Sequence, residues 1–148
     1  MALVYFDSSA FVKLLIDESG SDLAAELWDG CDAAVASRLA YPEVRAALAA
    51  AARNHDLTDQ DVAGAEKSWE GYWAAVRPVE LSAAVERQAG ALAQRHALRG
   101  ADAVHLASAL AISDPDLVLA VWDRRLHEGA RAAGVRVAPG QLGPLASR

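Results

Sequence analysis

Cysteine is almost absent from this sequence, and so are long apolar runs. The single cysteine, Cys31, excludes an internal disulfide and a cluster of thiolate ligands. No apolar run approaches the roughly 20 residues that a membrane-spanning helix needs. The first residues show no basic region followed by an apolar block, which argues against a secretory signal. The histidines lack zinc-type spacing: His55, His96, His105 and His127. These absences predict a cytoplasmic protein without a membrane partner.

Positive charge is also in short supply. The 148 residues have a net charge of −6, with 14 Lys and Arg against 20 Asp and Glu. A protein that coats nucleic acid is expected to be basic, so this balance argues against that class. It does not argue against a nuclease whose acids gather in one metal site. With 53% hydrophobic and 23% charged residues, the composition predicts a globular chain, with a single domain over residues 1–148.

Apolar strand-like runs alternate with helical patterns along the chain. Strands are predicted over residues 2–6, 33–37, 78–81, 117–122 and 135–137, and residues 139–148 are expected to be irregular. Helices are predicted over residues 8–17, 22–29, 38–55, 58–76, 82–98, 102–112 and 124–133. Such alternation predicts an α/β fold with a parallel sheet between two helical layers. The two helices within residues 38–76 have no strand between them, so they are expected to form a hairpin that protrudes from the sheet.

Asp7 and Asp123 occupy equivalent positions, each between an apolar strand and a helix. Parallel strands that end alike place both carboxylates at one edge of the sheet, where α/β proteins bind ligands. The alternative for Asp7 is that it only caps the following helix.

Two further acids interrupt apolar helical surfaces. Glu43 has Leu39, Ala46 and Ala47 as its helical neighbours, and a glutamate on such a stripe is rarely buried unpaired. An ion pair with Arg38 or Arg45 is the alternative. Asp102 lies in a nearly apolar helix, with His105 and Ser108 following at intervals of three residues. For Asp102 the alternative is a helix cap, and for His105 a structural hydrogen bond is expected rather than contact with metal or substrate.

Four gathered carboxylates need a counter-charge. At an effective dielectric of 20, two unit charges 4 Å apart repel by about 4 kcal/mol. A hard divalent cation removes this repulsion, and oxygen-only ligands suit Mg²⁺ or Mn²⁺. Such ions activate water and neutralise charge on a phosphoryl group. The four acids therefore suggest metal-dependent phosphodiester hydrolysis.

At these residues the chain resembles the PIN-domain ribonucleases, in particular the VapC toxins of bacterial toxin–antitoxin modules. The resemblance runs from Leu3 to about Val137. Its motifs are Tyr5-Phe6-Asp7-Ser8-Ser9-Ala10, Glu43 early in a helix, Ala101-Asp102-Ala103-Val104-His105-Leu106-Ala107, and Trp122-Asp123-Arg124-Arg125-Leu126.

The resemblance implies a three-layer PIN-like domain with a five-stranded parallel sheet in the order 3-2-1-4-5. It implies Mg²⁺- or Mn²⁺-dependent endoribonuclease activity that leaves 5′-phosphate and 3′-hydroxyl ends. It carries over Asp7, Glu43, Asp102 and Asp123 as the catalytic, metal-binding acids. The partners that it implies are an RNA substrate and a cognate antitoxin that inhibits the enzyme, in a homodimer or a toxin–antitoxin hetero-oligomer. The helix pair is where the antitoxin or a second toxin subunit would dock. Val121 departs from the family, which often has Thr or Ser two residues before the last acid.

Two other functions compete with this interpretation. A different Mg²⁺-dependent phosphohydrolase, such as an aspartyl phosphatase, usually has a second acid two residues after the first, where this chain has Ser9. A catalytically silent PIN-fold binding module is the other alternative, which the presence of all four acids disfavours. The aromatic residues Trp69, Tyr72 and Trp73 recur at helical spacing, and packing is expected for them rather than stacking on bases.

Overall fold

The computed structural model describes residues 1–144. Its strands are β1 (Leu3–Phe6), β2 (Ala33–Ser37), β3 (Arg77–Val79), β4 (Val118–Ala120) and β5 (Arg136–Ala138). Its helices are α1 (Ser8–Leu15), α2 (Ser21–Gly30), α3 (Ala40–Arg53), α4 (Asp59–Ala75), α5 (Ala83–His96), α6 (Gly100–Ala111) and α7 (Arg124–Ala132). Every predicted strand and helix is present, with ends displaced by a few residues.

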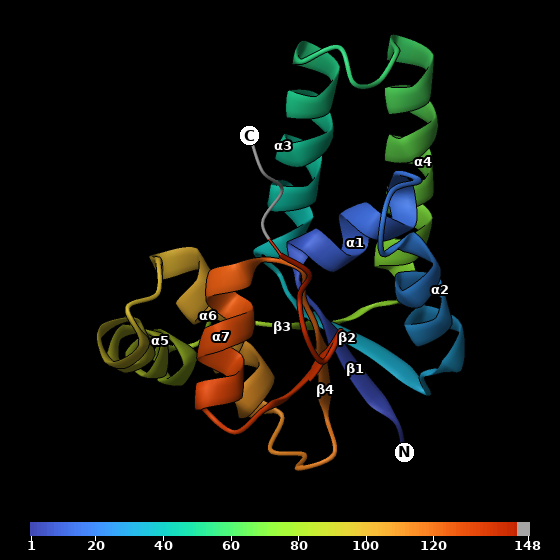
Figure 1. The fold of residues 1–148 in the computed structure, drawn as a ribbon. Coiled ribbons are helices and arrows are strands. Elements are labelled where there is room, and N and C mark those ends of the chain that lie inside the picture. The colour runs from blue at the N-terminus through green and yellow to red at the C-terminus, as the bar shows by residue number, and fades with distance from the viewer. Residues whose placement is uncertain (145–148) are drawn as a thin grey trace.

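The strands form one parallel sheet in the order β3-β2-β1-β4-β5, which confirms the predicted order (Figure 1). β1 is therefore central, with β2 on one side and β4 on the other. The apolar run at 117–122 overestimates β4, because the Leu117 amide bonds to the Asp114 carbonyl in the preceding turn. β3 begins and ends earlier than predicted, at Arg77 and Val79.

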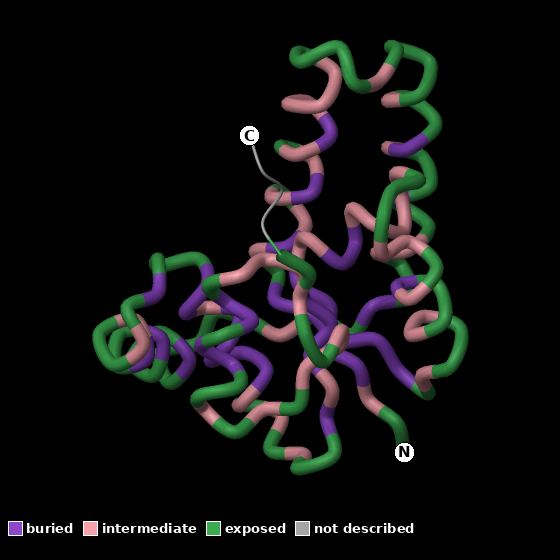
Figure 2. The backbone as a smooth tube through the Cα atoms, viewed as in Figure 1, coloured by how far each residue is buried: buried purple, intermediate pink, exposed green. Residues whose placement is uncertain are grey.

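Alternation along the strands separates two hydrophobic clusters, one on each face of the sheet. Tyr5, Val35 and Leu119 point into an aliphatic cluster with α5, α6 and α7. Val4 and Phe6 point to the other face, where aromatic residues of α1, α2 and α4 pack. Figure 2 shows the buried strands between these two layers.

Helices α3 and α4 form the predicted hairpin, and Figure 1 shows it standing away from the sheet. A capping box begins α4: the Thr58 hydroxyl accepts from the Asp61 amide, and the Asp61 carboxylate accepts from the Thr58 amide. α3 begins at Ala40 rather than at residue 38, since the Leu39 amide bonds to the Ser37 hydroxyl in the turn after β2. Because Ser37 ends β2, this turn delivers α3 to the carboxyl edge of the sheet.

Within residues 1–144, no helix has the length and apolarity to span a bilayer. Residues 139–144 contain no helix or strand, as predicted for the tail. The remainder of the tail prediction, for residues 145–148, lies outside the described residues.

Candidate active site

Strands β1 and β4 bring the first and last acids to the same edge of the sheet. Asp7 follows β1 directly, and its amide donates to the Ala120 carbonyl at the end of β4 (3.3 Å). Asp123 follows β4 and precedes α7. The Asp123 charge is close enough to contribute to the raised pKa of Asp7. The shared edge predicted for the two carboxylates is present.

Asp7 is deeply buried, with 4% of its surface exposed. It caps α1, because Oδ1 accepts from the Ala10 amide (3.0 Å), and the same oxygen accepts from the Ser9 hydroxyl (2.6 Å). Burial raises the pKa of Asp7 to about 6, although these hydrogen bonds act in the opposite direction. Asp7 therefore does cap α1, as the sequence alternative proposed. Its raised pKa indicates in addition that burial disfavours the charged carboxylate, as is common at functional sites.

Ser9 links Asp7 to the end of β4. Its hydroxyl accepts from the Trp122 amide (2.9 Å) while it donates to Asp7. The preceding residue, Val121, is fully buried in the aliphatic cluster. The position where the family often has a hydroxyl residue is therefore a packing position here, and Ser9 supplies a hydroxyl contact to Asp7.

Glu43 reaches the same edge from the first turn of α3. Its Oε1 lies 2.6 Å from Nε2 of His105 and accepts a 2.6 Å hydrogen bond from the Ser8 hydroxyl. Burial disfavours the charged form, but the contacts with His105 and Ser8 and the nearby charge of Arg99 outweigh it, so the pKa of Glu43 is lowered. Glu43 is thus held as a carboxylate.

The ion-pair alternative for Glu43 is wrong. Arg38 pairs with Glu80 at 2.6 Å, and Arg45 pairs with Glu70 at 3.3 Å. His105 is the partner instead, which confirms the structural hydrogen bond expected for that residue.

Arg99 joins the other two acids. Its Nε lies 3.0 Å from Oδ2 of Asp102, and its Nη2 lies 3.2 Å from Oδ1 of Asp123. The cap position of α6 belongs to Arg99, and no side chain caps that helix, so a capping role for Asp102 is wrong. Asp123 does cap α7, through the Leu126 amide. Arg99 is therefore an internal counter-ion for two of the four predicted acids.

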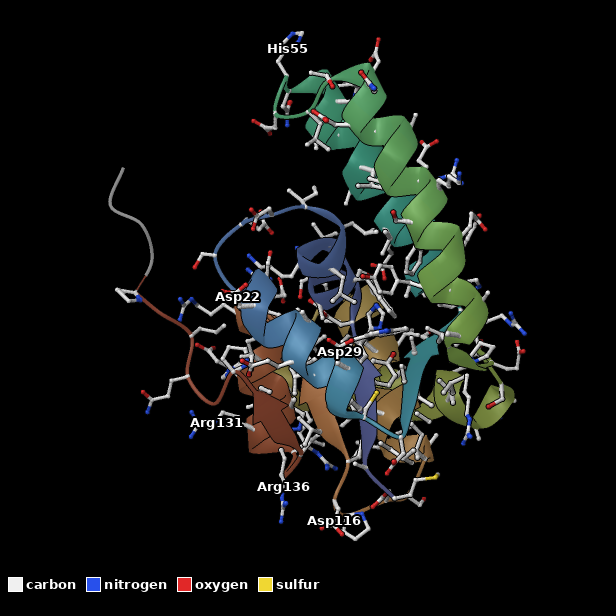
Figure 3. All side chains as sticks on the ribbon, turned by 90° about the vertical axis from the view of Figure 1, so that its right-hand side faces the viewer. Asp22, Asp29, His55, Asp116, Arg131 and Arg136 are labelled. Atoms are coloured by element: carbon white, nitrogen blue, oxygen red, sulfur yellow. The ribbon has the colours of Figure 1, made fainter. Side chains whose placement is uncertain are left out.

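The donor set fits a hard divalent ion in its chemistry, because all four side chains offer carboxylate oxygens. They are not gathered as a ready-made cage: among residues 1–144, no three His, Cys, Asp or Glu side chains are grouped to hold a metal ion. Two other residues of these types, His55 and Asp116, lie far from this edge. Figure 3 shows His55 at the tip of the helix hairpin and Asp116 at the opposite end of the molecule. We call the sheet edge that carries these four carboxylates the acidic edge. An ion bound there would have several oxygen ligands within reach, and it would replace Arg99 as the partner of Asp102 and Asp123.

Three contacts at this edge were not predicted from the sequence. Tyr5 bonds to His105, Ser9 supports Asp7, and Arg99 bridges Asp102 and Asp123. The spacing of Arg99 and Asp102, three residues apart across a helix start, was a readable signal. The contacts of Tyr5 and Ser9 join segments far apart in sequence, which no local pattern reveals.

Comparison with known proteins identifies the family of this chain. The PIN domain family model matches residues 4–131. Two Mycobacterium tuberculosis proteins, ribonuclease VapC45 of strain CDC 1551 / Oshkosh and ribonuclease VapC49 of strain H37Rv, are each 75% identical over 144 residues. That alignment covers 97% of this chain and 100% of each relative.

Solved structures show the same fold at low sequence identity. A toxin–antitoxin complex from Klebsiella pneumoniae has a TM-score of 0.66 at 20% identity, covering 97% of this chain and 100% of that chain. The M. tuberculosis VapC20 toxin, described as cleaving the sarcin–ricin loop, also scores 0.66, at 19% identity over 89% of this chain and 95% of that chain. The chain therefore belongs to the PIN-domain family, among its VapC-type members.

Proposed function

We propose that this protein is a divalent-metal-dependent endoribonuclease, the toxin of a toxin–antitoxin pair, acting in the cytoplasm. The observation that carries the proposal is the sheet edge shared by Asp7 and Asp123, where burial and the Asp123 charge raise the pKa of Asp7 to about 6. Arg99 links Asp123 to Asp102, and its charge helps to lower the pKa of Glu43. The 75% identity to proteins named as ribonucleases supports the reaction class.

Mg²⁺ or Mn²⁺ would be held by the four carboxylates, and when bound it supplies activation of water and neutralisation of phosphoryl charge. The chain's own residues prepare that site. The Ser9 hydroxyl and the Ala10 amide fix one oxygen of Asp7. Arg99, which is itself largely exposed, holds the buried Asp102 and the half-buried Asp123, and its guanidinium is available to a phosphate once it leaves them.

The charge distribution favours RNA approach from the α5 and α7 side. Helix α2 carries Asp22, Glu26 and Asp29 without any basic residue. Helices α5 and α7 carry two glutamates among five arginines: Arg87, Arg95, Arg124, Arg125 and Arg131. Because phosphates are attracted to clustered arginines, we place the RNA backbone along these two helices and away from α2.

The helix hairpin is the proposed docking surface for the antitoxin. Trp69 is fully buried and packs on Phe11 at 4.8 Å between ring centroids, so it is a core residue and does not stack on bases. Tyr72 and Trp73 are only partly buried, and a hollow beside Tyr72 is lined by Trp28 and Ser68. Several matched structures are toxin–antitoxin complexes, which supports a protein partner for this chain.

Cleavage of total cellular RNA by purified, antitoxin-free protein tests the proposal. We expect products with 5′-phosphate ends in Mg²⁺ or Mn²⁺ and no cleavage in EDTA. Asp7→Asn should be inactive, whereas Asp116→Asn, an exposed aspartate at the opposite end of the molecule, should cut like the wild type. RNA that stays intact with either ion, together with harmless expression in cells, would leave the binding-module interpretation in place of the toxin. Equal cutting by Asp7→Asn would show that the acidic edge is not the active site.

A further inference from the structure

A continuous chain of hydrogen bonds runs from β2 through the core to the acidic edge. The Ser37 amide donates to the Tyr5 hydroxyl oxygen (3.0 Å), and that oxygen lies 2.8 Å from Nδ1 of His105. Nε2 of His105 then lies 2.6 Å from Oε1 of Glu43. Tyr5 and His105 are 0% and 2% exposed, so water does not compete for these contacts. The chain ends on a carboxylate that the proposed reaction uses.

The groups determine which of them donates to Glu43. A carboxylate offers only acceptors, so Nε2 of His105 carries the hydrogen that points to Glu43. On the other side of the ring, the Tyr5 hydroxyl accepts from the Ser37 amide and forms a hydrogen bond with Nδ1 of His105. The imidazole is thereby held from both sides, with Nε2 directed at Glu43.

We propose that His105 is a positioning residue for Glu43, and that Tyr5 holds the imidazole ring in the orientation that does the positioning. The inference rests on the proposed function, since it assigns a supporting role at that same site. Two hydrogen bonds, from His105 and Ser8, converge on Oε1 of Glu43. They fix the long side chain in one orientation, and both of them use Oε1. Partners that orient a metal-binding carboxylate typically change metal affinity or activity by 10–100-fold when removed.

His127 provides the contrast between positioning and simple packing. It is also buried, at 4% exposure, and its Nε2 lies 2.8 Å from the Pro139 carbonyl. That bond ties α7 to the segment after β5 and touches none of the four acids. A substitution of His127 therefore reports the cost of losing a buried histidine without disturbing Glu43.

The experiment compares four variants of the full chain: His105→Leu, His105→Gln, Tyr5→Phe and His127→Leu. For each, the Mn²⁺ concentration that gives half of the maximal rise in melting temperature is measured, together with kcat and KM for a cleaved RNA. Glutamine places an amide N–H where Nε2 was, and leucine offers no donor. Phenylalanine keeps the ring of Tyr5 and removes only the hydroxyl.

We expect His105→Leu to raise the Mn²⁺ midpoint by roughly 10–100-fold and to lower kcat with little change in KM. His105→Gln should recover most of both losses, Tyr5→Phe should fall between them, and His127→Leu should lower the melting temperature without moving the midpoint. The proposal is overturned if His105→Leu and His127→Leu share one midpoint and one kcat, or if glutamine rescues nothing.

The outcome also separates this inference from the proposed function. If the wild type binds Mn²⁺ but cuts no RNA, the ribonuclease proposal fails while the midpoints still decide the role of His105. A wild type that neither binds Mn²⁺ nor cuts RNA overturns both.

Discussion

The two flanks of the acidic edge are stabilised by different kinds of partner. On the inner flank, Glu43 is held by His105, which is 2% exposed and fixed by Tyr5. On the outer flank, Asp102 and Asp123 share Arg99, whose side chain is 61% exposed. The buried histidine is held on both sides of its ring, whereas the exposed guanidinium of Arg99 is accessible to a competing ligand. The difference indicates that Glu43 is oriented before any ligand binds, whereas Asp102 and Asp123 can exchange Arg99 for a ligand.

Asp7 differs from the acids on both flanks, because it has neither a histidine nor an arginine as a hydrogen-bond partner. Among the described residues, its side-chain hydrogen-bond partners are the Ser9 hydroxyl and the Ala10 amide, and it forms no salt bridge. Burial raises its pKa to about 6, while the pKa of Glu43 is lowered. Burial is the main cause of the raised pKa of Asp7, and repulsion from Asp123 adds to it.

Asp7→Asn should have the largest effect. Loss of a metal-binding carboxylate removes several kcal/mol of transition-state stabilisation, which at 1.36 kcal/mol per tenfold lowers cleavage by at least about a hundredfold. The same variant should melt higher than the wild type in EDTA at pH 8. The asparagine oxygen can still accept from Ser9 and Ala10, but the buried charge is gone. Cleavage rates and melting curves measured side by side check both effects.

The stability gain of Asp7→Asn should depend on pH. The folded-state pKa of Asp7, about 6, exceeds its ordinary value of 3.8, so the folded state holds the proton more tightly. Wild-type stability should fall as pH rises from about 4 to 6, by about 3 kcal/mol if the whole shift is expressed. The advantage of the variant should thus be full at pH 8 and vanish near pH 4. An equal gain in stability at pH 4 and pH 8 would contradict the raised pKa of Asp7.

Glu43→Gln should act in the opposite direction and more weakly. It neutralises a carboxylate whose pKa is lowered by its partners, so it weakens charge-assisted hydrogen bonds from His105 and Ser8. The expected loss is about 1 kcal/mol, seen as a lower melting temperature in EDTA at pH 8. If both neutralisations raise the melting temperature, the contrast between Asp7 and Glu43 is wrong.

Arg99→Gln should have the smallest effect on stability, within about 1 kcal/mol, because Arg99 is largely exposed. It should also lower the Mn²⁺ concentration needed for thermal stabilisation, since the guanidinium no longer competes for Asp102 and Asp123. Arg87→Gln, an exposed arginine of α5, is the matched control and should leave that concentration unchanged. A higher requirement for Mn²⁺ in Arg99→Gln would show that Arg99 supports the ion instead of competing with it.

Local patterns in the sequence predict where the strands lie and pick out the four acids, whereas the strand order is implied by the resemblance to the PIN-domain ribonucleases. Asp7 and Asp123 each end an apolar strand, and parallel pairing then brings them together. The partners of the acids could not be predicted in the same way. Glu43 meets His105 across 62 positions of sequence, and the Trp122 amide meets Ser9 across 113. Such contacts depend on packing between layers, so the sequence indicates Arg38 or Arg45 for Glu43, where the fold supplies a histidine.

Calorimetric titration of Mn²⁺ into metal-free protein at pH 8 tests the central claim most directly, because it measures binding at the acidic edge without any RNA. Wild type and Asp116→Asn should bind Mn²⁺ with the same affinity, and Asp7→Asn should bind it at least about tenfold more weakly, given the 10–100-fold costs typical of disturbed metal sites. Absence of binding in the wild type, or equal binding by Asp7→Asn, would contradict the assignment of these carboxylates as a metal site.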